Sequence, residues 1–251
     1  MGKIIAIVNQ KGGVGKTTTA VNLSAALHAL GVKTLLCDFD PQANATSGLG
    51  LEKRRLKKTV YDVVINGESA KKAIVSTPYG DVLPSTGDLA GAAVELIGTE
   101  RREHQLSQAL ESVKNDYDVI FIDCPPSLEL LTLNGLCAAD SILVPVQCEY
   151  FALEGLSDLM STLRGVKRRL NPGLEIFGVV LTMFDGRTNF STQVAQEVRR
   201  HFPGKVFTTV IPRNVRLAEA PSHGIPVTAY DRLSRGSFAY KALAEEFKAK
   251  L

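Results

Sequence analysis

The sequence contains no apolar run close to the roughly 18–20 residues that a helix needs to cross a bilayer. It also has no signal-peptide pattern, because the strand-like run Lys3–Val8 begins almost at the N-terminus. Its four cysteines, Cys37, Cys124, Cys137 and Cys148, include no C-x-x-C pair. That spacing is typical of reduced thiols in a core rather than of a metal site. These absences predict a cytoplasmic protein that does not work in a membrane.

Internal repeats, low-complexity tracts and long linkers are also missing from the 251 residues. A chain of this length with 45% hydrophobic residues is able to form one large core. We therefore expect a single domain over residues 1–251. We expect no separate helix-turn-helix module, because nothing precedes the first strand that is long enough to form one.

Charge is unevenly distributed along the chain, although the net charge is only +3. Residues 1–159 hold 14 Lys and Arg against 19 Asp and Glu, whereas residues 160–251 hold 15 against 7. The basic C-terminal third suggests a polyanionic partner. A plain solvated basic surface is the competing interpretation, and charge alone does not separate the two.

Strand-like apolar runs alternate with helical patterns, and the strand-like runs lack polar alternation. This order predicts an α/β fold, a doubly wound and mostly parallel sheet with helices on both faces. The expected strands are Lys3–Asn9, Lys33–Cys37, Val82–Pro84, Val119–Ile122, Ser141–Pro145, Ile176–Leu181 and Val206–Ile211. The expected helices are Thr17–Leu30, Arg101–Val113, Leu153–Leu170, Ser191–His201 and Ser237–Leu251. The basic segment Leu51–Val75 is expected to be an exposed excursion after the second strand.

A glycine-rich motif lies between the first expected strand and the first expected helix: Lys11-Gly12-Gly13-Val14-Gly15-Lys16-Thr17-Thr18. This is the context that a phosphate-binding P-loop requires, since glycines let backbone N–H groups turn towards phosphate oxygens. The helix N-terminus adds a positive dipole end. Lys16 is expected to reach the β- and γ-phosphates, and the Thr17 hydroxyl to bind Mg²⁺.

The motif departs from the usual G-x-x-x-x-G-K-[ST] pattern at its first position, where Gln10 stands in place of glycine. A second lysine, Lys11, is present instead. Lys11 is able to serve the nucleotide of a facing subunit and to neutralise charge that develops in the transition state.

Aspartates end two of the expected strands. Asp123 follows Val119–Ile122 and resembles a Walker B aspartate, placed to hold the Mg²⁺ shell. Asp40 follows the second strand and is our candidate for positioning or activating the attacking water. Its neighbour Asp38 is expected to support the site from behind. A helix cap or turn residue is the structural alternative for an aspartate at a strand end.

The expected base is adenine. A GTPase usually carries Asn-Lys-x-Asp after a late strand, and the comparable stretch here, Thr182-Met183-Phe184-Asp185, lacks the Asn-Lys pair.

These motifs together resemble the ParA/MinD family of deviant Walker A ATPases, and more narrowly its ParA/Soj chromosome-partitioning branch. Besides Lys11–Thr18, the resemblance extends over most of the chain: Asp40-Pro41-Gln42, Asn44–Gly50, Asp123–Ser127, Pro145–Tyr150, Ala152–Leu156, Val210–Leu217 and Glu219–Ser222.

The resemblance implies an ATP- and Mg²⁺-dependent sandwich homodimer, in which Lys11 crosses to the partner's phosphates. It places Pro212 and Asn214 against adenosine. It also implies non-specific binding of double-stranded DNA by the ATP-bound dimer, hydrolysis stimulated by a ParB-like centromere-binding protein, and association with the nucleoid.

Arginines of the basic C-terminal third are the candidates for DNA contacts. Arg187 follows a strand end in a polar loop, and Arg216 follows the Pro212–Asn214 segment, where it is able to couple bound ATP to a DNA-facing surface. A helix cap or salt bridge is the alternative for Arg216, and a free surface charge for Arg187. Further candidates are Arg199, Arg200, Arg232 and Arg235.

Three other functions compete. A MinD-like, membrane-associated division-site ATPase needs a C-terminal amphipathic membrane helix, whereas Phe238, Leu243, Phe247 and Leu251 here fit a packing stripe. An iron–sulfur relative needs paired bridging cysteines. A DNA-binding structural protein with an inactive nucleotide site is disfavoured by the intact Lys16, Thr17, Asp40 and Asp123.

Overall fold

A computed structural model describes residues 2–127, 129–149 and 152–251 of the chain. Within these residues seven strands form one sheet in the order β3-β4-β2-β5-β1-β6-β7. Neighbouring strands are parallel except for β3 and β4. The strands are β1 (Lys3–Ile7), β2 (Thr34–Asp38), β3 (Val75–Thr77), β4 (Gly80–Leu83), β5 (Val119–Asp123), β6 (Ser141–Gln147) and β7 (Glu175–Thr182). The predicted doubly wound, mostly parallel sheet is confirmed.

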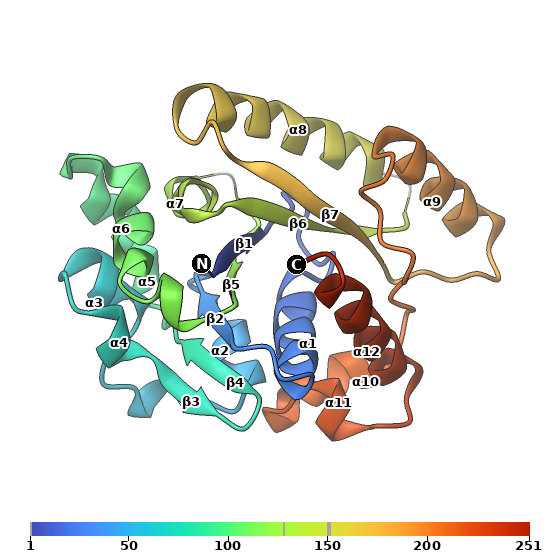
Figure 1. Ribbon diagram of the computed structural model, residues 1–251, viewed down its shortest axis with the longest axis horizontal. Coiled ribbons are helices and arrows are strands. Elements are labelled where there is room, and N and C mark those ends of the chain that lie inside the picture. Colours follow the sequence, from blue (N-terminus) through green and yellow to red (C-terminus); the bar gives the residue numbers. More distant parts are fainter. Residues whose placement is uncertain (1, 128, 150–151) are drawn as a thin grey trace.

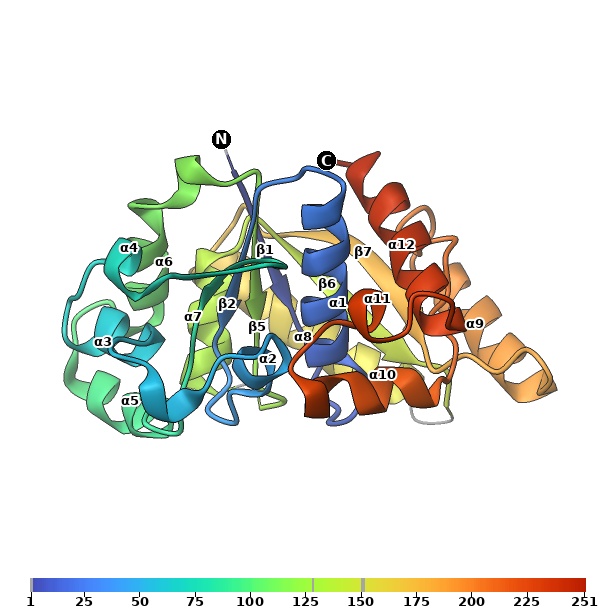
Figure 2. The same cartoon turned by 90° about the horizontal axis from the view of Figure 1, so that it is seen from below.

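Helices cover both faces of the sheet, as Figures 1 and 2 show. They are α1 (Lys16–Ala29), α2 (Asn44–Gly48), α3 (Val60–Ile65), α4 (Ala70–Ala73), α5 (Leu89–Glu95), α6 (Gln105–Glu111), α7 (Leu130–Ala138), α8 (Ala152–Arg169), α9 (Asn189–His201), α10 (Val215–Glu219), α11 (Val227–Tyr230) and α12 (Arg235–Lys248). Short 3₁₀ turns occupy Lys53–Arg55, Leu96–Gly98, Arg102–His104, Lys114–Asp116 and Ala220–His223.

The strands are apolar on both faces because each face is covered. In β1, Ile5 and Ile7 pack against α1 and α12, whereas Ile4 and Ala6 belong to the cluster formed with α6, α7 and α8. All four side chains are almost fully buried. A strand with two buried faces shows no polar alternation, which explains the continuous apolar runs in the sequence.

The carboxyl ends of the parallel strands meet at one edge. In the ladder, Asp123 at the end of β5 is level with Ile7 of β1 and with Asp38 of β2. The loop after β1 therefore opens directly beside two aspartates. Chains with this architecture bind ligands at this edge, outside the carboxyl ends of the strands.

The prediction of a strand at Val206–Ile211 is wrong. The segment does run beside β7, where Phe207 N–H donates to Val179 O over 2.9 Å and Ile211 N–H to Leu181 O over 2.8 Å. Between them, the N–H groups of Thr208 and Thr209 turn to the Glu246 carboxylate of α12, at 2.8 and 2.9 Å. The ladder is interrupted there, so only isolated bridges form.

The hairpin of β3 and β4 extends the sheet beyond what the sequence predicted, and the Leu51–Val75 segment is less exposed than expected. Helices α3 and α4 lie within it, and their Val60, Val63, Ala70 and Ala73 side chains are buried in the core. Only the basic turn Lys53–Arg55, which contains no buried residue, matches the expected excursion.

The last helix contributes the predicted packing stripe in part. Leu243 and Phe247 are fully buried, but Phe238 and Leu251 are 55% and 43% exposed. The predicted helix Arg101–Val113 is shorter than expected, since its first turn is a 3₁₀ turn before α6. No helix in the described residues has the length and apolar character that crossing a membrane requires.

Candidate functional site

The loop Lys11–Thr18 joins β1 to α1 at the carboxyl edge of the sheet. Gly13 and Gly15 have φ values of 75° and 89°, in the left-handed region. Residues with a Cβ atom are strained there, so glycine is needed at these two positions. Helix α1 begins at Lys16, one residue earlier than predicted, and its N-terminal N–H groups face the loop.

Two polar side chains that the sequence did not single out hold this loop in place. The Asn9 amide donates to Pro145 O of β6 over 2.8 Å, and its oxygen accepts from Lys11 N–H over 3.0 Å. The Thr182 hydroxyl at the end of β7 donates to Val14 O over 2.8 Å. The loop is thus tied to two strands besides its own. Asn9 has a sequence signal, its position directly before the loop, but the distance in sequence to Thr182 hides its role.

Lys16 is buried at the centre of the loop, where its ammonium group donates to Lys11 O over 3.2 Å. Burial lowers the pKa of Lys16, and the nearby Asp123 and Asp40 carboxylates oppose that shift. A buried ammonium group with one carbonyl partner retains donors for additional anionic ligands.

Asp123 is fully buried, and neither of its carboxylate oxygens accepts a hydrogen bond of ordinary geometry from the described residues. Burial raises the pKa of Asp123 strongly, and repulsion from Asp38 adds to this. The Thr17 hydroxyl lies near enough to oppose the shift weakly. An unpartnered buried carboxylate is costly, and it indicates a missing cationic ligand.

Asp38 and Asp40 have different surroundings. Asp38 accepts from the N–H and the hydroxyl of Thr46, at 2.7 and 2.6 Å, and so fixes the start of α2. Burial raises the pKa of Asp38 to about 6, against the effect of these hydrogen bonds. Asp40 accepts from Gln42 N–H over 2.9 Å, and its carbonyl accepts from the Ser85 hydroxyl over 3.0 Å. Asp40 is 7% exposed, so its carboxylate sits just inside the surface.

The residues present fit a Mg²⁺ ion. Hydroxyl and carboxylate oxygens are the ligands that Mg²⁺ prefers, and it is usually held by one or two carboxylates together with substrate phosphates. The Asp123 carboxylate offers two oxygens without hydrogen-bond donors, beside the Thr17 hydroxyl at the start of α1. No described group of three or more His, Cys, Asp or Glu residues forms a closed metal cage.

A cavity of about 360 Å³ opens beside the phosphate loop. It is lined by Gly15, Thr18, Thr182, Met183, Ile211, Pro212, Arg213, Asn214, Val215, Leu217, Ala218 and Tyr240. The two residues predicted to contact adenosine, Pro212 and Asn214, are thus on its wall. The Asn214 oxygen accepts from Arg216 N–H over 2.9 Å, which caps α10 and leaves the amide NH₂ group for a ligand.

Lys11 is paired within its own chain. Its ammonium group lies 3.5 Å from Glu149, whose other carboxylate oxygen accepts from Arg213 over 3.2 Å and from the Gln147 amide. Glu149 therefore connects the phosphate loop, the end of β6 and the wall of the nucleoside cavity. Lys11 and Glu149 are partly exposed, so the pair is open to exchange. The motif residue Tyr150 lies outside the described residues.

The arginines predicted to bind DNA lie on the last third of the chain and are largely paired. Arg187 makes a bidentate contact with Asp185, at 2.7 and 2.9 Å. Arg216 lies 2.7 Å from Glu219 and 3.2 Å from Asp231. Arg199 and Arg200 are in the last turn of α9, Arg235 begins α12 and Arg232 lies in the loop before it.

The four cysteines are buried, free thiols in the described part of the chain. Burial raises the pKa of Cys137 and of Cys148 to about 11. They remain protonated and unreactive near neutral pH.

Comparison with known proteins supports a common ancestry over the whole chain. A family model described as an AAA domain matches residues 2–176. The sporulation initiation inhibitor protein Soj of Bacillus subtilis is 57% identical, with 99% of each chain covered. The chromosome partitioning protein ParA of Myxococcus xanthus is 52% identical over 98% of this chain and 88% of that protein. A crystal structure of cobyrinic acid a,c-diamide synthase from Mycobacterium smegmatis with bound ADP and magnesium has a TM-score of 0.85 and 37% identity. It covers 98% of this chain and 93% of that chain.

The unpartnered carboxylate leads to a stability prediction. Without nucleotide and Mg²⁺, Asp123→Asn is expected to raise the free energy of unfolding by about 1–3 kcal/mol, because it removes a buried group that lacks partners. Since burial raises the pKa of Asp123 in the folded state, its contribution to stability falls as pH rises from about 4, the unfolded value. The gain from the substitution is therefore expected to be larger at pH 8 than at pH 5.

Urea denaturation at the two pH values measures this effect, with the exposed Asp158→Asn as a neutral control. A variant less stable than the wild type at pH 8 would show that Asp123 has a stabilising partner in the free protein.

Proposed function

The chain belongs to the Soj/ParA family of chromosome-partitioning ATPases, and on that premise we propose that it is an ATP-driven switch that segregates DNA. Mg²⁺-ATP binds at the loop Lys11–Thr18. In the proposed cycle ATP binding joins two chains and turns DNA binding on, and hydrolysis turns it off. The single observation that carries this proposal is the unpartnered Asp123 carboxylate beside the buried ammonium group of Lys16.

Each residue of the site has a role in nucleotide binding. Lys16 and the N–H groups of the loop bind the phosphates, and Thr17 with Asp123 would hold Mg²⁺, which neutralises phosphate charge when bound. Pro212 and Asn214 contact adenosine in the cavity beside Gly15. Relatives of known structure carry ADP or an ATP analogue with magnesium according to their descriptions, which supports this assignment.

Hydrolysis depends on the position of the attacking water. The Asp40 carboxylate is held by Gln42 N–H and lies at the same strand edge as Asp123. We assign Asp40 to orienting that water, since Asp38 is already engaged by Thr46. This division of labour leaves one aspartate for the water and one for the metal.

The proposed homodimer follows from Lys11. Lys16 already occupies the phosphate loop of its own chain, so a second lysine is free to act on the nucleotide of a partner. To do so, Lys11 must exchange Glu149 for the partner's phosphates. Because the pair with Glu149 is partly exposed, its contribution is only about 0–1 kcal/mol, and the exchange is feasible.

DNA is the proposed polyanion, bound through its phosphates and therefore without sequence preference. Arg187 and Arg216 are the principal candidates, and each must exchange its carboxylate partners for phosphates. A ParB-like protein at the centromere is proposed to stimulate hydrolysis. The protein would then be cytoplasmic and associated with the nucleoid while ATP is bound.

The two lysines of the loop are expected to have separable effects. Lys16→Ala should abolish productive ATP binding, because the triphosphate loses its main cation. Lys11→Ala should leave binding largely intact while ATP-dependent dimerisation and hydrolysis fall. Fluorescent-nucleotide titration measures the first effect, and light scattering with ATP and Mg²⁺ measures the second. Normal dimerisation of Lys11→Ala would exclude the role across the subunit boundary.

Asp40→Ala is expected to trap the dimer. The variant retains Lys16, Thr17 and Asp123, but loss of the group that orients water slows turnover by about 10²–10³-fold. Dimers should therefore accumulate in gel filtration with ATP and Mg²⁺, whereas the exposed control Asp158→Ala should behave like the wild type. A monomeric Asp40→Ala protein, or one with normal turnover, would contradict the assignment.

The switch itself is tested by DNA affinity with and without ATP. Arg216→Ala is expected to weaken ATP-dependent binding equally for all sequences and to reduce the log–log salt slope by about 0.9, one phosphate contact. Arg55→Ala is the matched control, because Arg55 is exposed and forms a similar pair with Glu52. Fluorescence anisotropy at several salt concentrations measures both. Equal wild-type affinity with and without ATP would refute the switch.

A further inference from the structure

A cluster of cations gathers at the C-terminal end of α8 and has no part in the nucleotide site. Arg164, Lys167, Arg168 and Arg169 are all exposed, and we refer to these four as the α8 patch. Within the described part of the chain, none of them has a carboxylate in salt-bridge range. This contrasts with Arg187 and Arg216, which are both paired.

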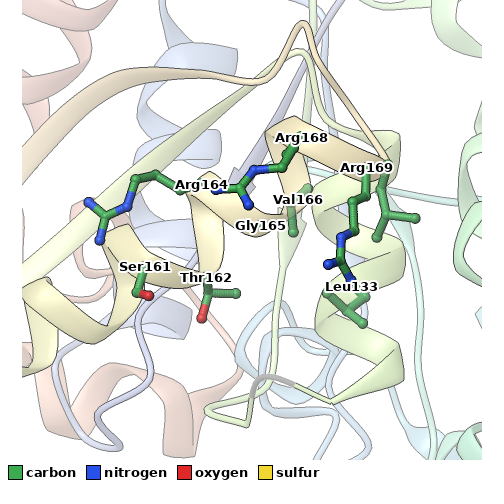
Figure 3. A pocket seen from close by; sticks show the side chains of 9 residues that line it. Leu133, Ser161, Thr162, Arg164, Gly165, Val166, Arg168 and Arg169 are labelled. Atoms are coloured by element: carbon green, nitrogen blue, oxygen red, sulfur yellow. The ribbon is translucent and has the colours of Figure 1, made fainter.

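The patch borders a groove of about 590 Å³, drawn in Figure 3. Its walls carry Arg164, Arg168 and Arg169 together with the hydroxyls of Ser161 and Thr162, and Leu133 of α7 lies at its base. A second groove of about 300 Å³ on the other side of α8 adds Lys167 and Lys205, with Glu175 as its carboxylate. Guanidinium and hydroxyl groups in a shallow groove suit phosphate oxygens.

The patch lies at the edge of the sheet opposite to the nucleotide. Strand β6 ends at the nucleotide edge, and α8 returns from there along the sheet (Figure 1). Beyond α8, the Asn171 amide donates to Leu136 O and Ala139 O, at 2.9 and 2.8 Å, just before β6 begins. Charges at this end are therefore set apart from the phosphate loop and from Arg187, which follows the far end of β7.

Helix stability alone does not account for the patch. One cation near a helix C-terminus gains about 0.3–1 kcal/mol from the dipole. Like charges at i,i+3 and i,i+4, as at Arg164, Lys167 and Arg168, cost a few tenths of a kcal/mol each, roughly 0.2–0.5. The basic last turn of α9 differs, because Glu197 approaches both Arg200 and His201. In the last two turns of α8 no acidic residue is interspersed.

We infer that the α8 patch is a second phosphate-binding surface for DNA, separate from the nucleotide-edge arginines and independent of ATP. The inference rests on the proposed function, since it takes DNA as the polyanion. The patch gives the nucleotide-free chain a weak and salt-sensitive affinity for DNA. A chain that has hydrolysed its ATP then stays close to DNA, and ATP adds the stronger contacts at the other edge.

The test compares DNA binding without nucleotide and with ATP and Mg²⁺, by anisotropy of a labelled random-sequence duplex at 50–200 mM salt. If three arginines contact phosphates, nucleotide-free binding of the wild type should fall about 40-fold over this range. The triple variant Arg164→Ala/Arg168→Ala/Arg169→Ala should lose this binding, with a slope smaller by about 2.7. It should retain the increase in affinity caused by ATP and the ATPase rate.

A matched variant, Arg54→Ala/Arg55→Ala/Lys57→Ala, removes three exposed cations elsewhere and should bind DNA like the wild type. Equal losses in both variants would show an effect of total charge and overturn the inference, as would an unchanged triple variant or a wild type that does not bind without nucleotide. Binding to phosphatidylglycerol vesicles that requires the patch, with DNA binding unaffected, would also overturn it. Failure of the proposed function is distinct, because ATP would then raise DNA affinity in none of the proteins.

Discussion

The nucleotide site depends on one electrostatic constraint, the burial of carboxylates at adjacent strand ends. The ladder between β2 and β5 places Asp38 level with Asp123, and both are fully buried. Asp38 is compensated by Thr46, but Asp123 has only the nearby Lys16 and Thr17 to offset its charge. The cost of this arrangement is relieved when a cation binds, so the free protein is built to accept a metal and a triphosphate together.

Other parts of the structure hold this edge in position. Asn9 and Thr182 tie the phosphate loop to β6 and β7, and Gly13 and Gly15 permit its path. The cations expected to meet an external partner are held in exposed ion pairs instead, as with Lys11 and Glu149. Such pairs contribute about 0–1 kcal/mol, so they orient the side chains and still release them to phosphates. Buried groups thus define the site, and exposed pairs prepare it for exchange.

Much of this arrangement was predictable from the sequence, because the chemistry is carried by short motifs. Lys16, Thr17 and Asp123 occupy one edge as expected, since the motif follows one strand and the aspartate ends another. What could not be predicted depends on contacts between distant residues. The interruption beside β7 comes from Glu246, which captures the Thr208 and Thr209 N–H groups. The role of Glu149 likewise appears only when the loop and the nucleoside cavity are brought together.

The central claim is that the catalytic site is completed by a second copy of the chain. The most direct test is the ATPase rate per chain, measured over a wide range of protein concentrations at saturating Mg²⁺-ATP. If Lys11 acts on the partner's nucleotide, the rate per chain should rise with concentration and level off once the dimer is fully formed. A rate per chain that stays constant down to concentrations at which light scattering shows only monomers would contradict the account.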